Sequence, residues 1–271
     1  MQEPDVEAPD EIKREFKEFL EKMKVKLACE FGSDYLERKI DDFVAIGTRP
    51  TSIISYHNQY FYQTRSAFVC GLYYPALVSA CALGERILNH LILDLRDFYR
   101  DSPKYKKICR KSSFDDWEIS IGALEAWGVL LPAAITAFRA LKFLRHRSIH
   151  FNNSTYSTVR EDALCAILHL REIIDQQFSA FGDRPWFIRG TRGQIFIRRD
   201  CEEIPFIKIF YLPSCPLVGP YFQLYFPDGP NLSARQVHDF PDYGDGEWTD
   251  EEFAATYEKR MPEQLVPIPL I

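Results

Sequence analysis

The sequence lacks the signals that mark several large protein classes. None of its seven cysteines forms a Cys-x-x-Cys pair, and their number is odd. This pattern argues against a disulfide or zinc framework and favours small buried thiols in a reducing cytosol. An excess of positive charge is absent too, because the formal charge is −6. The chain is therefore not expected to coat nucleic acid in general, a binding mode that depends on neutralising many phosphates, although this balance still allows a local basic patch.

Neither a secretory leader nor an uninterrupted apolar run stands out in the sequence. Residues 1–5 are acidic, and no apolar stretch follows them. The most hydrophobic run, residues 76–95, contains Glu85, Arg86 and Asp94, which break the apolar length that a membrane span needs. We therefore expect a soluble, cytoplasmic protein with no membrane partner. A hydrophobic content of 46% is that of a folded globular chain.

Apolar residues recur at spacings of three and four through the first two thirds of the chain, which predicts helices. Asp10 and Ser33 are expected to cap the first two helices, and Pro50 to open the third. The fourth helix is apolar nearly all round, which is typical of a central helix covered on most sides. The expected helices cover residues 10–27, 33–40, 50–69, 75–100, 117–127, 132–148 and 158–181.

The pattern changes after Gly182, where short runs rich in Ile, Phe and Tyr alternate with turn residues. Residues 186–189, 194–199, 204–212 and 221–226 are predicted as strands. Thr249 to Glu252 form a capping box that predicts a terminal helix. The expected fold is α+β: a helical domain over residues 1–182, then a small, mostly antiparallel β module with one terminal helix over residues 183–271.

Two histidines and two arginines crowd the end of the predicted helix 132–148, in the segment Arg145-His146-Arg147-Ser148-Ile149-His150. Charge there costs desolvation unless it is used. Histidine suits proton transfer near neutral pH, and the guanidinium fork of arginine suits a phosphate. Arg145 and His150 are therefore candidates for cleaving a phosphodiester. On an ideal helix, residues five apart lie about 140° apart, so their convergence needs the helix to loosen near His150 or the arginine to wrap back.

Alternatives remain open for these residues. Arg145 and His150 are also ordinary residues for a helix end. His146 and His150, four residues apart, share a helix face and form a candidate metal pair, but no third ligand is evident nearby.

The segment from Arg145 to His150 resembles the R-x(4–6)-H signature of HEPN-domain proteins. Residues 73–88, with small residues and Glu85 before aliphatic ones, resemble the central helix of that family, and the likeness covers about residues 50–181. The resemblance implies a four-helix-type bundle that acts as a metal-independent endoribonuclease without a cofactor. It also implies that Arg145 and His150 are catalytic, and that two protomers pair to form one composite site on RNA. The family is common in toxin–antitoxin and antiphage systems, which implies an antitoxin or regulatory protein as a further partner.

The remaining candidate residues are expected to support this site or to bind RNA. Glu85 either positions Arg145 or forms a structural ion pair. Asn152 stands where one subgroup of the family carries a modified tyrosine, so that modification is not expected here, and Asn152 is otherwise a turn residue or a substrate contact. The candidate RNA-binding cations are Lys104, Lys106, Lys107, Arg147 and Arg192. The alternative function is a non-catalytic HEPN-like module that binds a nucleotide, RNA or a protein.

Overall fold

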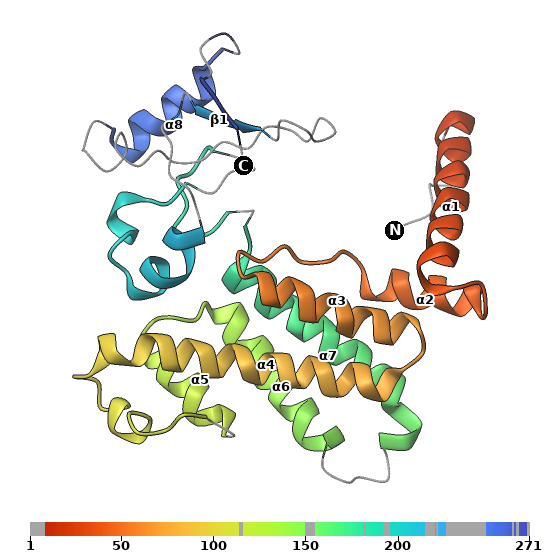
Figure 1. The fold of residues 1–271 in the computed structure, drawn as a ribbon, viewed down its shortest axis with the longest axis horizontal. Helices are drawn as coiled ribbons and strands as arrows, with labels where there is room; N and C mark the ends of the chain where they lie inside the picture. Colours follow the sequence, from red (N-terminus) through yellow and green to blue (C-terminus); the bar gives the residue numbers. More distant parts are fainter. Residues whose placement is uncertain are drawn as a thin grey trace.

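Seven helices, α1 to α7, contain most of the described residues before residue 180 (Figure 1). A computed structural model of the chain describes residues 9–113, 116–149, 155–180, 183–191, 196–214, 220, 222–225, 248–261, 263 and 266–269. The helices are α1 (Asp10–Phe31), α2 (Leu36–Ile46), α3 (Ser55–Val69), α4 (Tyr73–Leu95), α5 (Trp117–Ala126), α6 (Pro132–Ile149) and α7 (Thr155–Phe178). Two short 3-10 turns, η1 (Arg96–Tyr99) and η2 (Tyr105–Lys107), follow α4.

Helix α4 is the centre of the bundle, as its all-round apolar pattern predicts. It contacts α3, α5, α6 and α7, and Figure 1 shows these helices gathered into one body. Its inward positions, among them Leu77, Ala80 and Leu91, are almost completely buried. The exposed stripe that remains on α4 carries polar side chains, and the candidate site lies along it.

Two predicted helix caps are wrong. Asp10 is the first residue of α1, with Pro9 in the capping position. Ser33 does not cap α2, which begins at Leu36 after Tyr35, a residue with a left-handed φ of 55°. The predicted capping box of the last helix is confirmed: the Thr249 hydroxyl accepts from the amide of Glu252, whose carboxylate accepts from the amide of Thr249, and α8 spans Asp250–Lys259.

The predicted α+β fold with an antiparallel β module is wrong, because the described residues are mostly helical. Beyond α7 they form η3 (Arg199–Cys201), η4 (Ile207–Tyr211), η5 (Leu212–Ser214) and α8. Two four-residue segments, β1 (Phe222–Tyr225) and β2 (Val266–Pro269), pair in parallel. The antiparallel pairing described after α7 is limited to two isolated bridges, one between Ser179 and Ser52 and one between Phe187 and Ile197.

The segment 204–212 shows why the strand prediction failed. Its β-branched and aromatic residues favour a strand locally. Its buried side chains, however, are Phe206, Ile207 and Tyr211, and Ile204 and Ile209 are exposed. This is the spacing of a helix rather than the alternation of a strand, and the segment accordingly forms the π-helical turn η4.

Only some of the described cysteines are buried, contrary to the expectation of buried thiols. Cys81 and Cys201 are buried, whereas Cys29, Cys70 and Cys165 are exposed. Exposed thiols are open to solution chemistry, so burial does not account for all of the cysteines in this sequence.

By length and composition, the stretch Tyr73–Tyr99 could cross a membrane. Of its most apolar window, 56% is buried inside the molecule. A core helix of a soluble protein passes the same test, so this feature carries little weight, and the expected location stays a prediction.

Candidate functional site

Arg145 is held in place by an ion pair between α6 and α4. Its guanidinium lies 2.9 Å from a carboxylate oxygen of Glu85, and both side chains are about one third exposed or less. The same Glu85 oxygen accepts a hydrogen bond of 3.2 Å from the indole nitrogen of Trp117 in α5. Arg145 also lies over the Trp117 ring, 5.9 Å from its centroid. Three helices therefore fix the orientation of one arginine.

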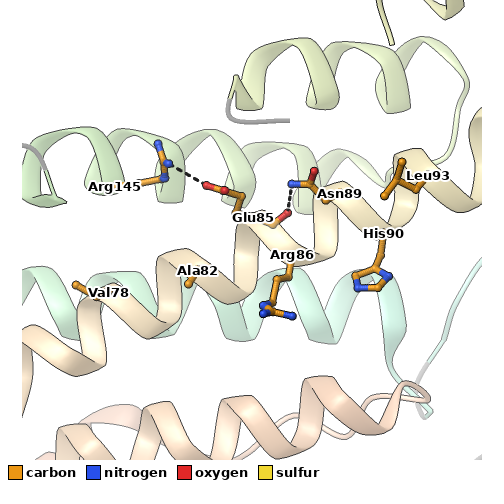
Figure 2. A pocket seen from close by; sticks show the side chains of 8 residues that line it. All are labelled: Val78, Ala82, Glu85, Arg86, Asn89, His90, Leu93 and Arg145. Atoms are coloured by element: carbon orange, nitrogen blue, oxygen red, sulfur yellow. Dashed lines mark hydrogen bonds and ion pairs between the residues drawn. The ribbon is translucent and has the colours of Figure 1, made fainter. Parts of the chain in front are cut away.

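A pocket of about 380 Å³ runs along the exposed stripe of α4 and reaches Arg145. Its lining consists of Val78, Ala82, Glu85, Arg86, Asn89, His90, Leu93 and Arg145. Figure 2 shows Glu85 directed at Arg145, while Arg86 and His90 project together from α4 in another direction. Asn89 donates to the backbone oxygen of Glu85 at 2.9 Å. The pocket thus offers cations, an amide and an imidazole beside a carboxylate that is about one third exposed.

The sequence analysis did not assign a role to Arg86, Asn89 or His90. The signal that would have found them is a polar stripe in an otherwise apolar helix, because positions 82, 85, 86, 89, 90 and 93 fall on one helical face. His90 also contacts the ring of Tyr56 in α3, with 5.2 Å between ring centroids. That contact places the imidazole at the α3 side of the pocket.

Cys81, which precedes Glu85 by one turn, is buried and does not supply a nucleophile to this site. Burial raises the pKa of its thiol to about 12, and the effects of Arg145 and Glu85 on that pKa oppose each other. The thiol is therefore protonated at neutral pH, and only a thiolate attacks efficiently. The described lining accordingly offers the charges of Arg145, Arg86 and Glu85 and the imidazole of His90.

His146 and Arg147 do not line this pocket. Arg147 forms an ion pair with the buried carboxylate of Asp162 in α7, which also accepts from the Thr158 hydroxyl at 3.1 Å. His146 is exposed on the last turn of α6. Arg147 therefore joins α6 to α7, and its predicted role in binding RNA stays a prediction.

The three candidate RNA-binding lysines lie in the connector after η1. Lys104, Lys106 and Lys107 are exposed, and none of them lines the pocket of Arg145. Arg96 shapes this connector by donating to the backbone oxygens of Ile108 and Lys111 at 3.1 and 2.5 Å. The lysines form a separate exposed basic surface at the far end of α4.

Three of the predicted site residues, His150, Asn152 and Arg192, lie outside the described residues. Helix α6 remains helical through Ile149, the residue before His150. The expected loosening of the helix at His150 and the metal pair of His146 and His150 thus stay predictions. Among the residues that the structure describes, no three His, Cys, Asp or Glu side chains are grouped to hold a metal ion.

Comparisons of the chain with models of protein families, with curated proteins and with solved structures found no match. The resemblance to HEPN-domain proteins thus rests on the residues quoted for it.

Proposed function

We propose that this protein is a metal-independent endoribonuclease of the HEPN type, in which Arg145 binds the scissile phosphate. One observation carries the proposal: an arginine of α6, held by Glu85 and Trp117, lies at the wall of a pocket on the central helix. An arginine whose orientation is fixed in advance stabilises developing phosphate charge without reorganising during the reaction. The proposed setting, by resemblance, is that of a toxin or an antiphage effector.

The proposed reaction is an attack within the RNA. The ribose 2′-oxygen forms a bond to phosphorus and gives its proton to a base, while the bond from phosphorus to the 5′-oxygen breaks. The leaving 5′-oxygen takes a proton from an acid, so the products are a 2′,3′-cyclic phosphate and a 5′-hydroxyl. His150 is the proposed proton-transfer group, because imidazole both accepts and donates protons near neutral pH.

A homodimer fits the chemistry, because the reaction needs two proton transfers and the motif supplies one histidine per chain. We propose that two copies bring their Arg145 and His150 residues together. The exposed stripe of α4 beside Arg145 would lie in or next to the shared site. Arg86 and His90 are then placed to contact the RNA backbone or bases, since both line the pocket.

The test is cleavage of RNA by the purified full chain in the presence of EDTA. The proposal expects cleavage that survives EDTA and leaves 2′,3′-cyclic ends, and a loss of roughly a hundredfold or more in Arg145→Ala and in His150→Ala. Arg139→Ala is the matched control. Arg139 lies on the same helix α6, pairs at the surface with Glu118 and Glu125, and does not line the pocket.

Intact RNA with the wild-type chain would overturn the proposal, and so would an Arg145→Ala/His150→Ala double variant as active as Arg139→Ala. Abolition of cleavage by EDTA would instead favour the metal pair of His146 and His150. Circular dichroism of each variant shows whether the fold is retained.

The second candidate is a binding module without catalysis. The observation in its favour is that Glu85 already neutralises Arg145, whereas Arg86 and His90 line the pocket without an ion pair to Glu85. In that case nucleotide or RNA binding is lost in Arg86→Ala and unchanged in His150→Ala. Loss of the biological effect in His150→Ala, with fold and binding kept, would rule this candidate out.

A further inference from the structure

A second pocket, away from Arg145, lies between α1 and the helices α2 and α3. Figure 1 shows α1 projecting from one end of the bundle beside α2. The pocket has a volume of about 600 Å³ and lies where the second half of α1 approaches this end. It is larger than the Arg145 pocket and shares no lining residue with it.

One part of the lining is apolar and partly open. Phe19, Met23 and Phe43 contribute to it, and Phe19 is 51% exposed although it belongs to the apolar face of α1. Leu27, about two helical turns further along α1, is buried. The apolar lining that α1 contributes to the pocket is thus open at Phe19 and covered at Leu27, as in pockets that bury the body of a small ligand.

The other part of the lining carries an excess of positive charge. Lys22, Lys26, Arg49 and Arg65 face a single acid, Glu30. Among the described residues, Lys22, Lys26 and Arg49 have no hydrogen bond or ion pair, and Glu30 accepts from the hydroxyl of Tyr62 at 3.2 Å. Four cations around one acid leave the pocket with unbalanced charge in a partly desolvated setting.

Arg65 shows the electrostatic cost of this arrangement. Its guanidinium stacks on Phe43, 4.2 Å from the ring centroid, and donates to the backbone oxygen of Gly47 at 3.1 Å. Its Nε is buried without a hydrogen-bond partner. Burial lowers the pKa of Arg65, and the neighbouring Arg49 lowers it further, against an opposing effect of Glu30. An anion between these two arginines would relieve both effects.

We propose that this pocket binds a small amphipathic anion, a molecule with one carboxylate or phosphate headgroup on an apolar body. The headgroup lies against Arg49, Arg65 and Lys26, and the apolar body covers Phe19, Met23 and Phe43. The volume is within the range of small-ligand pockets, about 300–1,000 Å³. This site is independent of RNA cleavage, so either proposal can fail without the other.

The test is isothermal titration calorimetry of the full chain with ligands of one chain length and different charge: decanoate, decanol and decylamine, with inorganic phosphate as a headgroup alone. Decanoate is expected to bind at least about tenfold more tightly than decanol and phosphate, because it alone combines a charge-assisted contact in a partly buried site with an apolar body. Decylamine is expected not to bind.

The variants Lys26→Ala and Arg49→Ala remove exposed cations of the lining, and each is expected to weaken decanoate binding by about tenfold. The matched control is Lys24→Ala. Lys24 lies on the same helix, pairs with Glu21 at the surface at 3.1 Å, and does not line the pocket. Absence of decanoate binding, equal affinity for decanoate and decanol, or unchanged affinity in the Lys26→Ala/Arg49→Ala double variant would overturn the proposal.

Discussion

Asp42 is a completely buried carboxylate whose charge is compensated by residues from three helices. Arg160 of α7 donates to it twice, at 2.7 and 3.0 Å, and the hydroxyl of Tyr73 donates at 2.9 Å. Arg38, one turn earlier on α2, lies 3.9 Å away. Removing one partner of such a group is costly, because it leaves the other charges without compensation.

Asp42→Ala is expected to lower the free energy of unfolding by about 3 kcal/mol, the lower end of the range for a buried ion pair, because Arg160 and Arg38 are partly exposed. Urea denaturation followed by circular dichroism measures the change. Asp97→Ala is the control: Asp97 pairs with Arg100 at the surface, with both side chains more than half exposed, and its loss should change stability by less than about 0.5 kcal/mol. Equal effects of the two substitutions would contradict the role given to Asp42.

His57 is a buried imidazole that stays neutral at ordinary pH. It is 1% exposed, packs against Tyr56 and Phe178, and its Nδ1 lies 3.0 Å from the Ser52 hydroxyl. Burial, followed by the nearby His90, lowers its pKa from 6.5 to about 3. The unfolded chain therefore binds a proton at this residue more readily than the folded chain.

The contribution of neutral His57 to stability is complete above pH 6.5 and is lost as the pH falls from 6.5 towards 3. Between pH 7.5 and 5 this residue should account for a decrease of about 2 kcal/mol in the free energy of unfolding. Urea denaturation across that range is expected to show a smaller decrease in His57→Phe than in the wild type. His90→Asn, at an exposed position of α4, removes only the smaller of the two causes that lower the pKa of His57, so most of the wild-type dependence should remain. An identical pH dependence in His57→Phe would show that His57 is not buried as a neutral group.

At the scale of the element, the packing of α4 depends on the close approach of side chains from α5 and α6 to Gly84. A Cβ at this position would lie 2.7 Å from a methyl carbon of Leu141 in α6 and 2.9 Å from the ring of Trp117 in α5. Trp117 in turn donates to Glu85, the partner of Arg145. Because Gly84 has no side chain, α4, α5 and α6 can pack closely next to Glu85 and Arg145.

Gly84→Ala is expected to lower stability by about 1–2 kcal/mol, because overpacking outweighs the gain of about 1 kcal/mol in helix propensity. RNA cleavage should fall with it, since Trp117 must shift. Gly122→Ala on α5 is the matched control: a Cβ there meets nothing within 4 Å, so stability should be unchanged or raised by up to about 1 kcal/mol. Thermal unfolding and cleavage rates measure both variants. A stabilised Gly84→Ala variant with full activity would contradict this account.

At the scale of the whole molecule, the chain after α7 contributes to the core of the bundle. Phe178 of α7 packs against Phe206 and Phe210, with ring centroids 5.8 and 6.3 Å apart. The buried hydroxyl of Tyr211 donates to the backbone oxygens of Gln177 and Ser179, both at 3.1 Å. The last turn of α7 is thus completed by residues that follow the predicted boundary at 182.

Tyr211→Phe is expected to lower the free energy of unfolding of the helical bundle by about 1–2 kcal/mol, because two buried carbonyls lose their shared donor. The helical signal in circular dichroism should show one cooperative transition that shifts as a whole. Unchanged unfolding of the helices, with loss of only the C-terminal residues, would instead favour two independent domains at 182.

The features predicted correctly are those that depend on residues close together in the sequence. The apolar period of three and four predicted the helices from α3 to α7, and Thr249 with Glu252 predicted the start of α8. Residues 204–212 failed because their β-propensity is a weak local preference, whereas packing on Phe178 selects a helical turn. From the sequence, Glu85 either positions Arg145 or forms a structural ion pair, and the choice stays open because no local pattern says which face of α4 meets α6.

The sequence by itself determined where most helices run and that α4 is central. It also determined that Arg145 lies near the end of a helix, where its charge needs a partner or a ligand. These properties follow from interactions within about four residues along the chain. Only the tertiary structure decided that Asp42 meets Arg160, that Glu85 and Trp117 hold Arg145, and that a cationic pocket opens beside α1. Those contacts join residues far apart in the chain, and the packing of whole helix faces selects them.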